Sequence, residues 1–220
     1  MTLDDAVRQR RSVRAFLPEA VPAATLQEVF ELAQWSPSNC NVQPWLPHVV
    51  SGAVLEALCT ELEAAALAGQ PFDPDWPADS PYHGVYRERQ HDAAARLYGA
   101  MGVARRDLDA RRAAYLRNHR CFDAPHAVFL FMQRPFDARE ATDLGMYAQT
   151  LMLALTARGI ASCAMGALGL YCATVRRHLG LADDHRLMFG IAFGFEDRSA
   201  PANAARTGRA ALADAVRFHG

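Results

Sequence analysis

The chain has 220 residues with 23 basic and 24 acidic side chains, which leaves a formal net charge of −1. Every basic residue is arginine, so chemistry that needs a lysine amine, such as pyridoxal phosphate catalysis or Walker-type nucleotide hydrolysis, is excluded. A near-neutral chain offers no strongly basic face for a nucleic-acid backbone, and we expect no nucleic-acid partner.

A chain of this length forms one sizeable domain or two small ones, and a hydrophobic content of 51% is ample for a packed core; we expect a single domain over residues 1–220. The N-terminus lacks the apolar segment of a signal peptide, and no apolar stretch approaches the ~20 residues of a membrane span. The five cysteines and eight histidines show no metal-ligand or disulfide-framework spacing. We therefore expect a cytoplasmic protein with no metal and no membrane partner.

The first elements along the chain are two helices and a strand. Thr2 is placed to cap a short N-terminal helix, and Thr25–Glu28 has the form of a capping box ahead of a second helix. A polar loop at 36–45 then leads into a strand over Trp45–Val50, where Pro47 indicates a sheet edge or a bulge.

A helix over Ala53–Ala68 precedes a long segment of different composition. Residues 69–122 begin with prolines, aspartates and aromatic residues and continue as arginine-rich sequence of high helix propensity. This change in composition predicts an excursion from the core.

The second half of the chain predicts the centre of the fold. Continuous apolar runs are typical of strands buried on both faces, and amphipathic stripes predict the helices that cover them. The strands are expected at Ala127–Gln133, Ile160–Met165 and Leu187–Phe195, and the helices at Asp143–Arg158 and Tyr171–Leu179. Buried strands between helices favour a three-layer α/β/α sandwich.

Four short clusters could form a site. The first is RRSVRAF at 10–16, in which Arg10, Arg11 and Arg14 surround the hydroxyl of Ser12. Guanidinium groups bind phosphate oxygens in a bidentate manner, so these side chains could hold one small dianion. A solvated basic turn is the alternative interpretation.

The second cluster is the loop SPSNCNVQPW at 36–45, with Pro37, Ser38, Asn39 and Asn41. Amide side chains in a loop stiffened by proline suit a flat heterocycle that carries both donors and acceptors. The alternative is a turn whose side chains only bond their own backbone.

The third cluster, SCAMGA at 162–167, contains small residues that let a ligand approach the backbone. The fourth is the segment NAARTGR, whose Arg206 and Arg209 stand in an otherwise bland tail. A frayed basic terminus is the alternative interpretation of the fourth cluster.

These clusters, in this order, resemble the FMN-dependent nitroreductase family. RRSVRAF has the family's R-x-S-x-R-x-F pattern, the loop has its P-S-x-x-N-x-Q-P-W pattern, and NAARTGR has its N-x-x-R-T-x-R pattern. The middle segment is most similar to the nitrobenzoate-reductase branch. The resemblance implies an α+β fold, a three-layer α/β/α sandwich with a central mixed sheet, in an intertwined homodimer with FMN at its interface.

The resemblance also assigns residues to the cofactor. The N-terminal cluster and the C-terminal arginines would hold the phosphate and ribityl groups, the polar loop would come from the partner subunit, and the third cluster would pass the flavin N5. The implied cofactor-binding residues are Arg10, Arg11, Ser12, Arg14, Pro37, Ser38, Asn39, Asn41, Ala164, Met165, Gly166, Arg206 and Arg209. A glutamine is expected where Met165 stands, a departure that bears on substrate preference.

The implied activity is reduction of an aromatic acceptor, most directly a nitroaromatic such as a nitrobenzoate, with NADH or NADPH in a ping-pong cycle. Arg14 is the implied catalytic residue, because its charge would stabilise the reduced flavin near N1. Residues 69–122 would cover the active site and 199–220 would reach the partner subunit.

Within the excursion, an aromatic wall and an arginine anchor for a substrate carboxylate are expected. The candidates for the wall are Tyr82, Tyr86, Tyr98 and Phe122, and those for the anchor are Arg105, Arg106, Arg111, Arg112, Arg117 and Arg120. Two other functions stay open: an ene or quinone reductase or reductive dehalogenase of the same fold, and an FMN-binding carrier without turnover.

Overall fold

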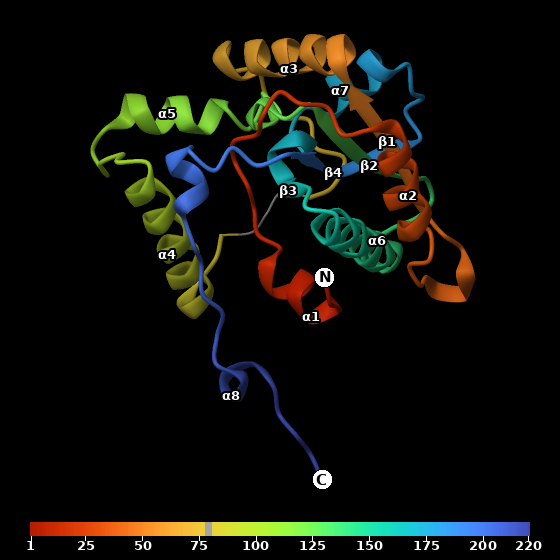
Figure 1. Cartoon of the computed structure of the whole chain (residues 1–220). Coiled ribbons are helices and arrows are strands. Elements are labelled where there is room, and N and C mark those ends of the chain that lie inside the picture. The colour runs from red at the N-terminus through yellow and green to blue at the C-terminus, as the bar shows by residue number, and fades with distance from the viewer. Residues whose placement is uncertain (78–80) are drawn as a thin grey trace.

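The computed structural model describes residues 1–77 and 81–220 and contains a four-stranded sheet between two layers of helices (Figure 1). Residues 78–80, which belong to the predicted excursion, lie outside the described residues. The strands are β1 (Trp45–Ser51), β2 (His126–Gln133), β3 (Ala161–Met165) and β4 (His185–Gly194). The α-helices are α1 (Leu3–Gln9), α2 (Ala23–Ala33), α3 (Gly52–Leu67), α4 (Gly84–Ala100), α5 (Leu108–Leu116), α6 (Ala138–Ala157), α7 (Cys172–Leu179) and α8 (Leu212–Ala215). Short 3₁₀ helices are η1 (Asn39–Asn41), η2 (Cys121–Asp123), η3 (Gly166–Gly169) and η4 (Pro201–Ala204).

The strand order is β1-β2-β4-β3, and each neighbouring pair is antiparallel. The prediction of a mixed sheet is therefore wrong, because the four strands form an antiparallel sheet. The unit β2-α6-β3 does bring two parallel strands into the sheet, but β4 lies between them and runs in the opposite direction. In the described part of the chain, parallel pairing is confined to the isolated bridge between Ser12 and Ser162.

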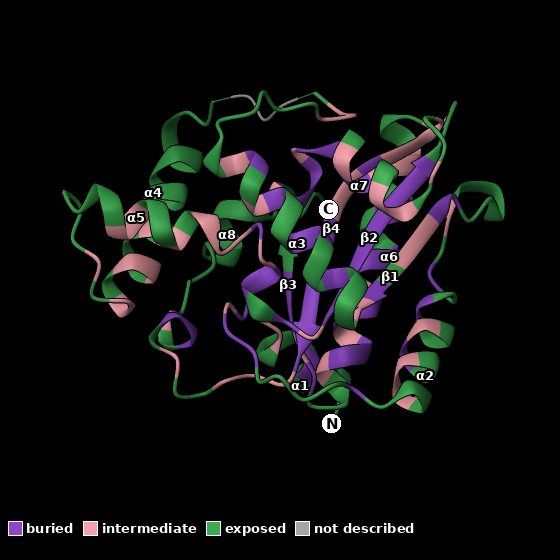
Figure 2. Cartoon of the chain, turned by 90° about the horizontal axis from the view of Figure 1, so that it is seen from above, coloured by how far each residue is buried: buried purple, intermediate pink, exposed green. Residues whose placement is uncertain are grey.

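The three-layer prediction is confirmed. One face of the sheet packs on α3 and α7, and the other packs on α2 and α6. β2 is buried on both faces, because Phe129 and Phe131 enter the first core whereas Val128 and Leu130 enter the second. Figure 2 shows this central strand buried as far as Met132 among exposed outer helix faces. The sandwich therefore holds β3 and β4 in fixed positions.

Local signals explain most of the boundaries. Pro47 lies in β1 at the edge of the sheet, as expected for a residue without a backbone N–H. Thr2 caps α1, and its hydroxyl accepts a hydrogen bond from Asp5 N at 3.2 Å. The predicted capping box at Thr25 is wrong: α2 begins at Ala23 after Pro22, whose φ of −55° already suits a helix start.

The two helices of the predicted excursion lie outside the sandwich, whereas Cys121 and Phe122 at its end are buried in the core. α4 and α5 project to one side of the molecule, and neither contains a buried residue (Figure 1). The last segment, from Arg206 to Gly220, is exposed throughout and extends away from the body. The helices α4 and α5 and the C-terminal segment therefore leave much of their surface exposed.

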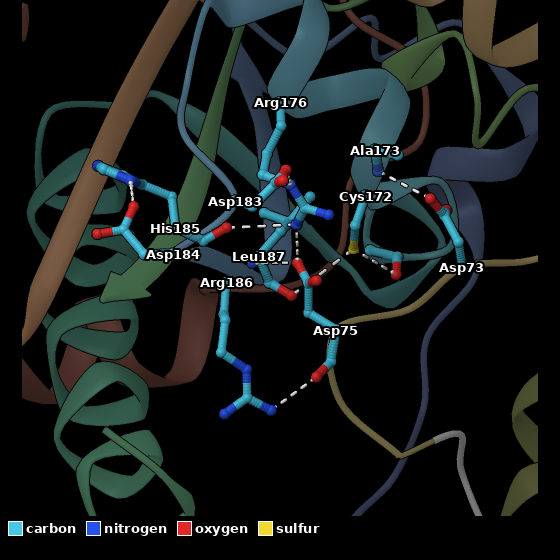
Figure 3. A network of polar contacts seen from close by, with 11 residues as sticks. Asp73, Asp75, Cys172, Ala173, Arg176, Asp183, Asp184, His185, Arg186 and Leu187 are labelled. Carbon is cyan, nitrogen blue, oxygen red and sulfur yellow. Dashed lines mark hydrogen bonds and ion pairs between the residues drawn. The ribbon is translucent and has the colours of Figure 1, made fainter. Parts of the chain in front are cut away.

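A strap formed by residues 72–76 fixes the start of the excursion (Figure 3). The Asp75 carboxylate accepts from Arg176 Nη1 at 2.5 Å and from Leu187 N at 2.8 Å, and the Arg176 and Asp75 side chains are only 12% and 9% exposed. The Asp73 carboxylate accepts from Ala173 N at 2.9 Å, near the start of α7. The strap thus ties the excursion to α7 and β4.

Candidate functional site

The N-terminal arginine segment lies beside β3. Val13 N donates to Ser162 O at 3.1 Å, and further along Leu17 N donates to Phe195 O at 2.8 Å. The segment is therefore extended between the two strand ends, with Val13 buried. The half-buried Arg14 follows it on the chain. The first predicted cluster is consequently held on the sheet and is not a solvated turn.

The C-terminal cluster meets this segment. Asn203, in η4, accepts a hydrogen bond from Arg14 N at 2.7 Å through its side-chain oxygen. Arg206 Nη1 donates to Asn203 O at 2.7 Å, so Arg206 is held next to the same residue. Arg209 lies further along the exposed tail, where its Nη1 donates to Gly208 O at 2.8 Å. The segment with Asn203 and Arg206 therefore lies against the N-terminal arginine segment.

The arginines at this place differ in how their charge is compensated. Arg11 is paired with Glu196 at 2.5 Å. Among the residues that the structure describes, no acidic side chain forms an ion pair with Arg10, Arg14 or Arg206. We call these three residues the arginine cradle. Uncompensated guanidinium groups at one place favour an anionic ligand.

Cys163 of β3 lies beside the cradle but is not a nucleophile. Burial raises the pKa of its thiol, whereas Arg14, a hydrogen bond with Ser12 and Arg10 lower it to a smaller extent. The thiol is therefore protonated near neutral pH, and reactive cysteine chemistry requires a thiolate. The site must act by binding and electrostatics.

The end of β3 presents open backbone to the surface. Ala164 and Gly166 are exposed, whereas the Met165 side chain between them is 3% exposed and packs into the core with α3 and α7. A Cβ at Gly166 would meet no atom within 4 Å, and its backbone φ is not left-handed. Neither the packing nor the conformation of this chain needs a glycine there, so the open backbone fits the close approach of a flat ligand.

η3, which follows β3, is seated directly on β4. A Cβ at Gly169 would lie 2.8 Å from Met188 O, and a Cβ at Gly190 would lie 2.5 Å from Leu168 Cδ1. The glycines therefore allow the turn and the strand to approach closely. This contact fixes the position of the open backbone at 164–166.

The polar loop at 36–45 is held by hydrogen bonds and a ring stack. Asn39 N donates to the buried Asp143 carboxylate on α6 at 3.1 Å, and Gln43 N donates to Ser38 Oγ at 3.0 Å. The ring of Trp45 stacks on Tyr147 with 5.0 Å between ring centroids. Some side chains of the loop therefore bond its own backbone, as in a self-contained turn, whereas others remain exposed and could contact a heterocycle.

Backbone conformation sets this loop apart. Cys40, Asn41 and Gln43 have φ values of 49°, 58° and 48°, a region that costs non-glycine residues of the order of 1–3 kcal/mol each. Pro37, Asn39 and Asn41 are exposed. Strain combined with exposed amides is typical of a binding loop.

The loop and the arginine cradle lie at opposite corners of the sheet. Trp45 begins β1 at one edge, whereas Ser162 lies on the other edge strand, in the row that ends at Ser51. Strand geometry places these corners roughly 20 Å apart along the strands and roughly 14 Å apart across them. In Figure 1 the loop between α2 and β1 projects on one side, and the chain rising from α1 passes β3 on the other. Within one chain, the loop and the arginine cradle are therefore too far apart to contact the same heterocyclic ring.

The excursion arginines are also sorted by their contacts. Arg117 and Arg120 pair with Asp123 at 3.4 and 3.2 Å, and the guanidinium of Arg111 lies 4.0 Å from the centroid of the Tyr98 ring. Asp107 caps α5, because its side chain accepts from Ala110 N. Of the predicted aromatic wall, Tyr82 and Tyr86 are exposed and Phe122 is buried.

Three residues that shape the site had no assigned role in the sequence interpretation. They are Glu196, Asn203 and Asp143, which hold Arg11, Arg14 N and Asn39 N respectively. Asp143 gave a signal, because it is a charged residue at the start of an apolar helical stripe. Glu196 gave none, because contact with Arg11 depends on tertiary structure.

The cradle and the open backbone of β3 fit a flat, anionic ligand, whereas the amide loop lies at another corner of the sheet. Residues 7–195 match the Nitroreductase family. Nitroreductase NfnB of Mycolicibacterium smegmatis is 44% identical over 213 residues, which cover 96% of this chain and 90% of that protein. A 4-nitrobenzoate reductase of a Nocardioides strain is 32% identical over 203 residues, which cover 90% of this chain and 82% of that protein.

A solved structure is similar over nearly the whole length. The crystal structure of the FMN-dependent nitroreductase NfnB from Mycobacterium smegmatis in complex with NADPH has a TM-score of 0.94 at 42% identity, covering 99% of this chain and 97% of that one. The chain belongs to the nitroreductase family. This confirms the prediction from the motifs, and the 4-nitrobenzoate reductase relative supports the predicted branch. No helix among residues 1–77 and 81–220 is long and apolar enough to cross a membrane.

Proposed function

We propose that this protein is an FMN-dependent oxidoreductase that takes hydride from NADPH and reduces nitroaromatic compounds. The family match over residues 7–195 supports this function, as does the similarity to an FMN-dependent nitroreductase crystallised with NADPH. The observation within this chain that carries the proposal is the uncompensated arginine cradle beside the open backbone at 164–166.

The residues present fit FMN. Arg10 and Arg206 would bind its phosphate, and Ser12 would contact the ribityl chain. Arg14 would place positive charge beside the pyrimidine edge of the ring, where negative charge develops on reduction. When bound, FMN supplies the redox chemistry, a ping-pong transfer of hydride from nicotinamide to acceptor. Arg209 would close the phosphate site from the exposed tail.

The active unit is proposed to be a homodimer. The ring would lie against Ala164, Met165 and Gly166 of one chain and against the 36–45 loop of the other, which supplies Pro37, Ser38, Asn39 and Asn41. The diagonal placement of the two clusters supports this arrangement. Exposed apolar side chains on α1 and the C-terminal tail, including Leu3, Leu212 and Phe218, also favour burial against a second copy.

The excursion at 69–122 is proposed to cover the acceptor. Arg105, Arg106 and Arg112 are the candidates for a substrate carboxylate, because the other three predicted anchor residues, Arg111, Arg117 and Arg120, have contacts within the chain. The five cysteines are free, which suits the reducing conditions of the cytoplasm. We place the protein there.

An absorbance spectrum followed by an acceptor screen tests the function. The purified protein should show bound flavin, and anaerobic NADPH oxidation should be fastest with nitrobenzene or 4-nitrobenzoate. Enones, quinones and halophenols are the comparison acceptors, and faster turnover of any of them would replace nitro reduction by that activity. A flavin-bound protein that does not oxidise NADPH with any acceptor would be a carrier.

A further inference from the structure

A single buried amide joins three parts of the chain at the arginine cradle. Asn203 is 4% exposed, and its Oδ1 accepts from Arg14 N at 2.7 Å. Its Nδ2 donates to Ala15 O and to Asp197 O, both at 2.8 Å. The side chain thus uses its acceptor and both donors on backbone groups of two different segments.

The backbone of Asn203 holds a second arginine. Arg206 Nη1 donates to Asn203 O at 2.7 Å and to Ala205 O at 2.9 Å. Arg14 is fixed through its backbone and Arg206 through its guanidinium, so the relative position of these two cations depends on Asn203. Their segments are otherwise separated by nearly the whole sequence.

We propose that Asn203 is a positioning residue that sets the separation of Arg14 and Arg206 and thereby preorganises the cradle for the anionic cofactor. The inference rests on the proposed function. A cradle whose cations are placed during folding binds more tightly, because less ordering is needed when the ligand arrives.

Asn203 is not the main anchor of the N-terminal segment. On one side of Arg14, Val13 N bonds Ser162 O, and on the other Asp197 N bonds Ala15 O at 3.1 Å and Leu17 N bonds Phe195 O. These bonds stay when the amide is removed. We therefore expect Asn203 variants to fold, while Arg14 N, which lies between these bonds, loses the partner that sets its position.

Two substitutions separate the contributions of the amide. Asn203→Ala removes all three hydrogen bonds of the side chain. Asn203→Asp keeps the shape and the acceptor for Arg14 N, but loses both donors and places a carboxylate against two carbonyl oxygens. Gln27→Ala is the matched control, because the Gln27 amide is exposed on α2 and, among the described residues, bonds Glu31 alone.

The test is titration of each apoprotein with FMN, together with the midpoint potential of the bound flavin and urea unfolding of the apoprotein. Both Asn203 variants should unfold cooperatively and bind FMN about tenfold more weakly, while the control matches the wild type. The Asp variant should also lower the potential, because a negative charge near Arg14 disfavours the reduced, anionic flavin.

A double-mutant cycle distinguishes positioning from general loosening of the structure. In a background carrying Arg14→Ala and Arg206→Ala, Asn203→Ala should change FMN affinity by no more than about twofold. The same loss in both backgrounds would overturn the inference, and so would wild-type affinity and potential in both Asn203 variants. A wild-type protein that binds no FMN would instead remove the proposed function itself.

Discussion

Arg11 Nη2 lies 2.5 Å from Glu196 Oε1, and this ion pair joins the segment after α1 to the end of β4. The two side chains are 27% and 16% exposed, so the pair is largely removed from water. The charge of Arg11 is thus compensated within the chain, whereas Arg14 has no acidic partner among the described residues. Two arginines three positions apart therefore have different environments.

This difference predicts separate consequences for the two arginines. Arg14→Ala should raise the Kd for FMN by about tenfold to a hundredfold, as expected for the loss of a charge-assisted contact. Arg11→Ala should weaken FMN binding by only a few fold but destabilise the apoprotein by about 1–3 kcal/mol, because Glu196 loses its partner. FMN titration and urea unfolding measure both effects. Equal losses of FMN affinity would place Arg11 in the cradle.

Subunit complementation tests the shared site. A chain carrying Arg14→Ala and a chain carrying Asn39→Ala with Asn41→Ala should each form homodimers with weakened FMN binding and low activity. In the mixed dimer one site receives both defects and the other receives neither, so co-expression should restore activity and tight FMN binding at one of the two sites. The measurement is FMN stoichiometry and NADPH oxidation of the purified mixed dimer. No recovery in a confirmed mixed dimer would contradict a site built from two chains.

The strap offers a matched pair of substitutions around one arginine. Arg176 contacts the buried Asp75 at 2.5 Å and the fully exposed Asp183 at 3.7 Å. Asp75→Ala leaves the Arg176 charge buried without its partner and should lower the free energy of unfolding by about 3–5 kcal/mol. Asp183→Ala should change it by less than about 1 kcal/mol, because the contact is solvated. Urea unfolding of both variants measures the two effects. Similar losses of unfolding free energy would contradict the idea that burial makes the contact with Asp75 the stronger one.

The main elements could be predicted because they depend on local pattern. The continuous apolar run of β2 and the proline in edge strand β1 are visible in sequence alone. The position and direction of β4 between β2 and β3 could not be predicted, because an apolar run does not indicate which strand it pairs with or in which direction. The arginine motifs could also be found in the sequence, because each lies within a few consecutive residues. The contacts of Arg11 with Glu196 and of Arg14 N with Asn203 could not, because these partners lie at the other end of the chain.

Buried His126 predicts a loss of stability in acid. Burial lowers the pKa of His126, and its Nε2 accepts from Val21 N at 2.9 Å, which requires the neutral ring. The unfolded chain binds the proton at a higher pH, so stability is complete above about pH 6.5 and falls below it by up to about 1.4 kcal/mol per pH unit. His126→Gln should reduce this slope, whereas His219→Gln on the exposed tail should not. Urea unfolding between neutral pH and about pH 5.5 gives the slopes, and an unchanged slope in His126→Gln would contradict the assignment.

Gly166 allows cofactor approach to be separated from protein stability. A Cβ at Gly166 meets no protein atom within 4 Å, and the same holds for Gly145 in the exposed face of α6. Gly145→Ala should stabilise the apoprotein by about 0.5–1 kcal/mol and leave FMN binding unchanged, because alanine favours a helix. Gly166→Val should leave the apoprotein within about 1 kcal/mol of the wild type but weaken FMN binding, because the new side chain occupies the space in front of the backbone. Wild-type FMN affinity in Gly166→Val would mean that the flavin ring does not lie against 164–166.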